Sequence, residues 1–218
     1  MKKESESMRD MFKLSFGEEI GNSVSHGVMA VLCLLVLPYV AVRSYLNYGV
    51  IGTVGQSIYV ICIFTMFLGS CIYHAMEFGS NQKYVFRILD HCFIYLAIAG
   101  TYTPILLSLV GGTKGLVLLI IEWGTTIAGI LMTACSRKAH KVLSMVLYMA
   151  MGWIAIFILP TLIKVASPLF LGLIVLGGVF YTIGAVFYAK KFPYAHFVWH
   201  IFINLASIAH FIAIVFIM

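Results

Sequence analysis

The chain alternates between long apolar runs and short polar segments. A helix that crosses a membrane needs about 20 mostly apolar residues. Seven runs meet this length, at residues 24–46, 54–76, 85–108, 115–135, 142–163, 168–189 and 196–217. The segments between them are short and carry helix-breaking residues such as Gly79 and Pro193. The pattern predicts an all-α membrane protein built as a bundle of seven transmembrane helices.

Two prolines refine this expectation. Ser167 followed by Pro168 is typical of a helix N-cap and the first helical position, so the sixth run should begin there. Pro104 lies inside the third run, where it removes a backbone hydrogen bond and should kink the helix.

The basic residues predict the direction of the bundle. Of the 14 Lys and Arg residues, 11 lie before the first run or after the second, fourth and sixth, and three lie on the other side. Basic loops stay in the cytoplasm, so the N-terminus should be cytoplasmic and the C-terminus outside. An even number of helices would destroy this alternation. We expect residues 1–21 to form a cytoplasmic N-terminal segment without a cleaved signal peptide, and residues 22–218 to form the transmembrane domain.

Composition supports the membrane interpretation. The chain is 62% hydrophobic and 10% charged, whereas a soluble domain is about 25% charged. Membrane topology accounts for the net charge of +6, so we expect membrane lipid and not nucleic acid as the partner. Association into a homo-oligomer is left open.

The five cysteines show no CxxC spacing and are predicted to be buried free thiols: Cys33, Cys62, Cys71, Cys92 and Cys135.

Four ionisable residues end apolar runs on the predicted cytoplasmic side: His74, Asp90, His196 and His200. Ionisable groups in membrane helices are costly and therefore indicate function. His196 and His200 are four residues apart, so both imidazoles project from one helix face. With His74 they supply the three ligands of a catalytic zinc site, although three histidines also suit other transition metals. Zinc lowers the pKa of its bound water to about 7.

Ser70 and Asp90 are the candidate catalytic residues beside this site. Ser70 lies one turn before His74 and would bond the metal-bound water or a substrate oxygen, or simply a backbone carbonyl. Asp90 would orient the water, act as a general base, or accept a hydrogen bond from a ligand histidine. A role as a helix-start carboxylate is compatible with these.

Further polar residues lie outside this set. The spacing of Glu19, Asn22 and His26 places them on one helical face, where we expect a structural polar cluster near the site. Glu122 and His210 lie deeper, and a pairing of Glu122 with His210 or with Lys114 is left open. His91 should point away from Asp90, and His140 should be solvated in a basic loop.

Together these residues resemble one family. Four motifs stand in order along the chain: Glu19-x-x-Asn22-x-x-x-His26, Ser70-x-x-x-His74, Asp90-His91 and His196-x-x-x-His200. In this order they resemble the haemolysin III proteins, which belong with the progestin and adiponectin receptors, over about residues 16–217. The run from Leu89 to Pro104 looks like the bacterial branch, which implies a location in the bacterial inner membrane.

The resemblance implies a seven-helix bundle with a cytoplasmic-side zinc held by His74, His196 and His200. Ser70 and Asp90 fall on the family's adjacent polar positions. Related eukaryotic receptors are thought to have ceramidase-like hydrolytic activity, and bacterial members have been linked to cell lysis and membrane lipid homeostasis. This chain lacks the long N-terminal region of the eukaryotic receptors, which argues against hormone reception.

Three functions compete. The first is a zinc-dependent hydrolase of a lipid amide or acyl bond. The second is a non-enzymatic membrane sensor or regulator with structural zinc. A cytolysin ranks lowest, because a secreted toxin should hide its apolar surface before insertion. Glu122 and His210 also leave a proton or ion transporter open, although the sequence gives no gated pathway.

Overall fold

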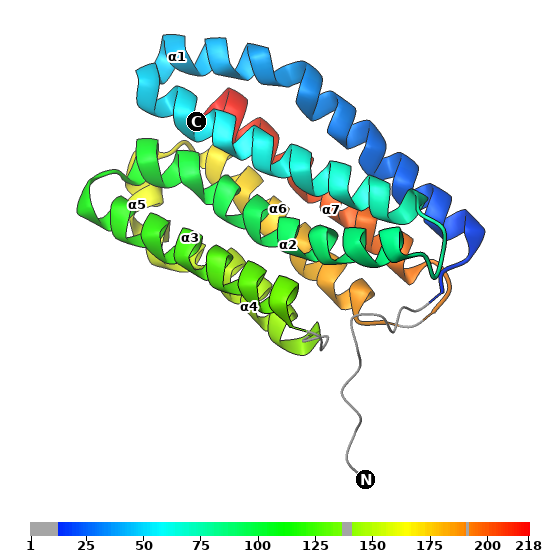
Figure 1. Cartoon of the computed structure of the whole chain (residues 1–218). Coiled ribbons are helices and arrows are strands. Elements are labelled where there is room, and N and C mark those ends of the chain that lie inside the picture. The colour runs from blue at the N-terminus through cyan, green and yellow to red at the C-terminus, as the bar shows by residue number, and fades with distance from the viewer. Residues whose placement is uncertain (1–12, 137–140, 191) are drawn as a thin grey trace.

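The computed structural model describes residues 13–136, 141–190 and 192–218, which fold into helices joined by short turns. Figure 1 shows the helices packed side by side as a bundle with roughly aligned axes. η1 and η2 are π-helical. In chain order the elements are α1 (Phe16–Ala75), α2 (Asn81–Pro104), η1 (Ile105–Val110), α3 (Gly112–Cys135), α4 (Lys141–Trp153), α5 (Ala155–Val165), α6 (Pro168–Tyr188), α7 (Ala195–Phe211) and η2 (Ile212–Ile217).

Six helical stretches of the described chain are long and apolar enough to cross a membrane. They are Phe16–Ala75, Asn81–Val110, Gly112–Cys135, Val142–Val165, Pro168–Tyr188 and Ala195–Ile217. This confirms the prediction of an all-α membrane protein. The count of seven helices and the direction of the termini stay predictions. Several basic residues behind that direction lie outside the described ranges: Lys2, Lys3, Arg9, Arg137, Lys138 and Lys191.

The 60 residues of α1 fold back on themselves at Gly49. Gly49 has φ 65° and ψ −157°, a conformation that only glycine adopts readily. In Figure 1 the blue first half and the cyan second half of α1 lie side by side. The Ser23 hydroxyl donates a hydrogen bond to the Cys71 carbonyl at 3.0 Å, which ties the two halves together. The start and the end of α1 therefore meet at one end of the bundle.

Two irregular backbone segments face each other further along the bundle. The expected disturbance at Pro104 takes the form of a change in helix type, because α2 ends there and continues as η1. The fifth predicted run is divided at Ile154 into α4 and α5. The Tyr102 hydroxyl bridges this break: it donates to the Gly152 carbonyl at 2.6 Å and accepts from the Ala155 amide at 2.9 Å. It thereby pairs backbone groups that lipid could not satisfy.

The distribution of side chains is that of a protein dissolved in lipid. Large apolar side chains such as Leu35 and Leu46 are more than 70% exposed, whereas Gln56, Glu122 and His200 are fully buried. Such a surface would be unstable in water but suits hydrocarbon. Polar chemistry is therefore concentrated inside the bundle.

All five cysteines are free, as predicted, but their burial is less uniform than expected. Cys33, Cys62 and Cys92 are buried and Cys71 is half-buried. The prediction of a buried thiol is wrong for Cys135, which is exposed because it is the last residue of α3.

The turn of α1 also fixes the end of η2. Side chains from α1 donate to three carbonyls near the end of the chain: Arg43 to Phe216 at 3.2 Å, Gln56 to Ile214 at 3.1 Å, and Tyr48 to Met218. The last carbonyls of a helix have no partners within it, so these donors supply them. They hold η2 in register with both halves of α1 beside the reversal at Gly49.

Candidate metal centre

α7 presents His196 and His200 from its first two turns. The helix starts at Ala195, directly after Tyr194 turns the chain with a positive φ of 64°. The spacing of four residues places both imidazoles on the face that packs toward the end of α1. His74 lies on the last turn of α1 and faces them. The three histidines thus come from two elements far apart in the sequence.

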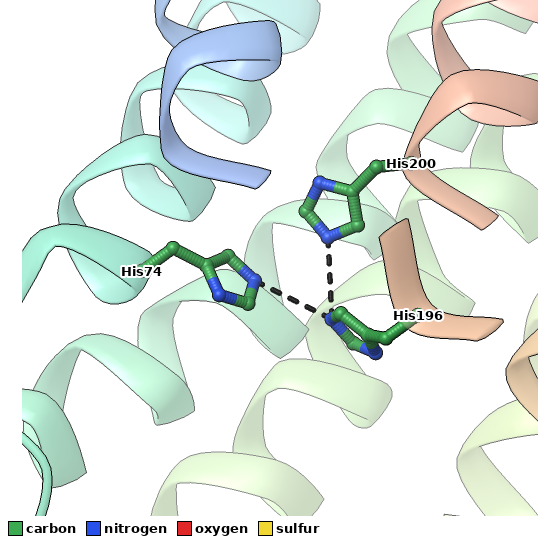
Figure 2. A group of neighbouring side chains, drawn as sticks. All are labelled: His74, His196 and His200. Carbon is green, nitrogen blue, oxygen red and sulfur yellow. Dashed lines mark hydrogen bonds between the residues drawn. The ribbon is translucent and has the colours of Figure 1, made fainter. Parts of the chain in front are cut away.

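The Nε2 atoms of the three rings converge on one point (Figure 2). The Nε2 atoms of His74 and His196 lie 3.4 Å apart, and those of His196 and His200 lie 3.2 Å apart. One ligand atom from each histidine lies within 4.8 Å of the other two, and His74 and His200 are buried. These three residues could hold a metal ion.

Two of the three spacings between the nitrogens match a tetrahedral ion. Zinc binds imidazole at about 2.0–2.1 Å, and the edge of a tetrahedron is about 1.63 times that length, so neighbouring ligand nitrogens lie roughly 3.3–3.4 Å apart. The two measured separations, 3.4 and 3.2 Å, match this edge. Three neutral nitrogen donors also leave a fourth position for water or substrate, as in catalytic zinc sites. The donor set therefore fits zinc, although it does not identify the metal.

Glu19 fixes the orientation of His74. The His74 Nδ1–H donates to the Glu19 carboxylate at 2.6 Å, which leaves Nε2 as the unprotonated nitrogen facing the other rings. The Asn22 amide lies at 3.5 Å from the same Nδ1. A carboxylate behind a ligand histidine sets its tautomer and raises its basicity. On sequence alone, this role is one of three alternatives for Asp90, whereas in the structure Glu19 makes the contact.

Lys83 supports Glu19 from α2. Its ammonium group donates to Glu19 at 2.8 Å and to the carbonyls of Tyr73 and Met76 at 3.2 and 3.1 Å. The lysine is almost fully buried, so its charge is paired and all three of its donors are used. On sequence alone, Lys83 counts only as a basic loop residue. Its position in the first turn of α2 does not by itself indicate a contact with Glu19.

His26 completes the polar group that enters from the first half of α1. Its ring stacks on His200 with centroids 3.9 Å apart and meets Phe67 edge-on at 5.1 Å. Both ring nitrogens are buried and have no hydrogen-bond partner among the described residues. The predicted cluster of Glu19, Asn22 and His26 therefore lies at the site, and its members touch two of the three histidines.

The structure brings Ser70 and Asp90 near the site without joining them to the histidines. Both are buried, and no hydrogen bond links either to the three imidazoles in the described part of the chain. Asp90 lies within electrostatic reach of Tyr73 and Tyr188. The Tyr188 ring is 5.9 Å from that of His196 and the Tyr73 ring is 4.6 Å from that of His74, so both tyrosines are near Asp90 and near the three histidines.

Two further described histidines, His91 and His210, are not among the three that could hold the metal. The His91 Nδ1 lies 2.8 Å from the Arg87 carbonyl on its own helix, and His140 lies outside the described residues. Neither suggested pairing of Glu122 is present: Lys114 donates to Thr161, His210 to the Ile174 carbonyl, and both Glu122 oxygens are buried without a hydrogen bond to any described residue.

Comparison with known proteins gives consistent matches over most of the chain. The model of the family described as Haemolysin-III related matches residues 14–211. The chain is 34% identical to the Hemolysin-3 homolog of Bacillus subtilis over 201 residues, which cover 91% of this chain and 93% of that protein. It is 32% identical to Hemolysin-3 of Bacillus cereus, with 91% of each covered. The human Monocyte to macrophage differentiation factor is 26% identical over 72% of this chain and 67% of its own length.

Proposed function

This chain belongs to the haemolysin III family of the progestin and adiponectin receptor superfamily, and from that premise we propose that it is a zinc-dependent hydrolase of a lipid amide or acyl bond. It is a multi-pass integral protein of the bacterial plasma membrane. A substrate that resides in the membrane follows from this location. The convergence of three imidazole nitrogens inside an apolar bundle is the observation that carries the proposal.

The topology we propose has seven transmembrane helices. Each half of α1, on either side of Gly49, is long enough to cross the membrane, so α1 contributes two crossings. α4 and α5 together contribute one, since they form a single apolar stretch. The N-terminus is then cytoplasmic, the C-terminus outside, and the metal centre at the cytoplasmic end. Residues 1–21 would be the cytoplasmic segment, although α1 itself begins at Phe16.

The metal ligands in this proposal are His74, His196 and His200. A bound zinc ion would supply Lewis acidity and make hydroxide available at neutral pH. Glu19 keeps the His74 ring in the ligating tautomer, and Lys83 keeps the Glu19 carboxylate ionised and in place. Burial of the His74 and His200 rings would limit the access of bulk water to the site.

Hydrolysis adds one water molecule across the scissile bond. The carbonyl carbon gains an oxygen, the bond to nitrogen or to the ester oxygen breaks, and the leaving group takes a proton. We assign the proton transfer to Asp90, which would accept a proton from water and deliver it to the leaving group. We assign to Ser70, one turn before His74, a hydrogen bond to the carbonyl oxygen as negative charge develops on it.

Metal analysis of purified protein tests the site. We expect about one zinc per chain in the parent and none in His200→Ala. His91→Ala is the matched control, because it removes an imidazole that lies outside the centre. Circular dichroism would establish that each variant is folded. Absence of metal in the folded parent after zinc repletion would contradict the proposal.

Turnover of lipid amides tests the reaction. Parent protein in lipid nanodiscs should release fatty acid from a panel of lipid amides and esters, and His200→Ala should not. Asp90→Ala should keep its zinc and lose turnover. A parent that holds zinc and hydrolyses no member of the panel would contradict the hydrolase and leave the metal centre intact.

A membrane sensor with structural zinc is the second candidate. The three ligands join only α1 and α7, so a bound ion would fix the relative position of these helices without any catalysis. In that case Asp90→Ala would hold zinc and retain the function of the protein in cells. Loss of cellular function in Asp90→Ala, with zinc retained, would favour the hydrolase.

A further inference from the structure

A second group of polar side chains, two of them buried and three half-buried, lies deeper in the bundle than the histidines of the metal centre. It comprises Tyr59 of α1, Tyr181 of α6, and Asn204, Ser207 and His210 of α7. His210 is ten residues beyond His200, which is about 15 Å along a helix axis. The group, called the second polar cluster below, is therefore separate from the metal centre.

Contacts between helices hold this cluster together. The hydroxyls of Tyr181 and Ser207 lie 2.9 Å apart, and the His210 ring meets the Tyr181 ring edge-on at 5.5 Å. Tyr59 interacts electrostatically with Tyr181, and its ring lies 6.4 Å from that of Phe211, the neighbour of His210. Asn204 lies one turn before Ser207 on α7. Contacts thus bring four of the five side chains into one interior region, and Asn204 adjoins it through its position on α7.

Several of these groups have hydrogen-bonding capacity that the described residues do not use. The Tyr59 hydroxyl, the Asn204 Oδ1 and the His210 Nδ1 are buried and have no partner there. Such atoms cost free energy when they remain unpaired, and lipid tails cannot pair them. In native proteins, ordered water or a ligand normally does so.

The chemistry of the unused groups identifies the ligand class. The His210 Nε2–H donates to the Ile174 carbonyl at 3.0 Å, so its Nδ1 is an acceptor. The Asn204 Oδ1 is a second acceptor. Tyr59 offers a donor, and the pair of Tyr181 and Ser207 retains one hydroxyl hydrogen after bonding each other. A set of donors and acceptors without a carboxylate, lysine or arginine suits a neutral group that both donates and accepts.

We propose that the second polar cluster binds a neutral hydroxyl inside the bundle, either a water molecule or the hydroxyl of a lipid. Two to four polar partners are available, which is the number an internal water requires. The ligand bonds to Tyr59 and His210 and thereby links α1 to α7 at the level of α6. The bundle then has a second interior binding site that does not depend on the metal.

Tyr59→Phe tests the proposal, because it removes only the hydroxyl. We expect its melting temperature to fall by roughly 2–4 °C, the shift for the loss of about one hydrogen bond. Tyr39→Phe is the matched control, since Tyr39 is half exposed to lipid and should show no change. An unpaired phenol would give the opposite result, because phenylalanine would then remove a buried polar group without a partner. A rise or no change in Tyr59→Phe therefore overturns the proposal.

Radiolytic hydroxyl labelling distinguishes the two sources. An X-ray pulse generates radicals from bound water, which oxidise adjacent side chains even when bulk solvent cannot reach them. Oxidation of Tyr181 and His210 in delipidated protein, with buried Phe170 unlabelled, identifies water. A melting-temperature loss confined to lipid-containing samples, without labelling, identifies a lipid hydroxyl. A loss in both samples without labelling means that Tyr59 bonds to protein and overturns the proposal.

Discussion

Glu19 and His74 are separated by 55 positions, yet the Glu19 Oε2 lies 2.6 Å from the His74 Nδ1. The contact exists because α1 reverses at Gly49 and brings its first turn beside its last. A carboxylate in this position contacts the ring of His74, one of the three proposed metal ligands. The fold-back of α1 therefore positions both the proposed ligand and the carboxylate that orients it.

Replacement of Glu19 should weaken metal binding without abolishing the fold. In Glu19→Gln the amide still reaches His74 but carries no charge, so the imidazole becomes a poorer ligand. We expect zinc affinity to fall about 10–100-fold, as is usual for partners of ligand histidines. Competition with a chromophoric chelator would measure it. Glu77→Gln, an exposed carboxylate just beyond α1, is the control, and equal affinities in both variants would contradict the role of Glu19.

Lys83→Met should destabilise the protein. The substitution preserves the apolar stem but leaves the Glu19 carboxylate and the carbonyls of Tyr73 and Met76 without their donor. Hydrogen bonds to charged groups contribute about 1.5–3 kcal/mol, and we expect a loss of unfolding free energy in that range. Denaturant unfolding in detergent would measure it against Lys190→Met, which changes an exposed lysine. If both variants unfold at the same midpoint, the network around Lys83 adds no stability.

Two adjacent glycines of α6 should respond differently to alanine. A Cβ at Gly177 would lie 2.2 Å from the His210 ring, whereas one at Gly178 would meet nothing within 4 Å. Gly177→Ala should therefore cost about 1–3 kcal/mol through overpacking. Gly178→Ala should be neutral or stabilising, because alanine has the higher helix propensity. Thermal unfolding of the pair checks this, and similar melting temperatures would show that α6 and α7 are less closely packed here.

Removal of the Glu122 carboxylate should stabilise the bundle. Its two oxygens are buried without a hydrogen-bond partner among the described residues, which lowers the free energy of unfolding. Leucine at this position removes these unpaired polar atoms. We expect Glu122→Leu to raise the unfolding free energy by roughly 1–3 kcal/mol. Glu122→Gln, similar in shape but still polar, is the comparison and should not give the same gain. A lower melting temperature in Glu122→Leu would mean that the carboxylate has a favourable interaction.

The sequence predicts the helices and the depth of the candidate site in the membrane, because both depend on where apolar runs begin and end. His74, His196 and His200 end or begin such runs, so their depth follows from topology alone. Their approach to one another also requires a rotation of α1 and α7 about their axes. That rotation is set by packing and by hydrogen bonds such as Gln56 to Ile214, which no local pattern specifies.

The roles of Glu19 and Lys83 could not be predicted for a related reason. A carboxylate beside a helix start and a lysine after a loop are each common, and each is satisfied by solvent in most proteins. Only the reversal of α1 places them together. Topology places Asp90 at the level of His74, so a hydrogen bond to a ligand histidine is one of its three suggested roles, whereas in the fold it is Glu19 that contacts His74.

The division of the metal centre between α1 and α7 has a consequence for biosynthesis. His196 follows His74 by 122 residues, which take about 6–24 s to synthesise at 5–20 residues per second. During that interval Glu19, His74 and Lys83 have all been synthesised, because Lys83 follows His74 by only nine residues. The ion-paired part of the candidate centre therefore precedes its other two proposed ligands, which arrive only with the last helix.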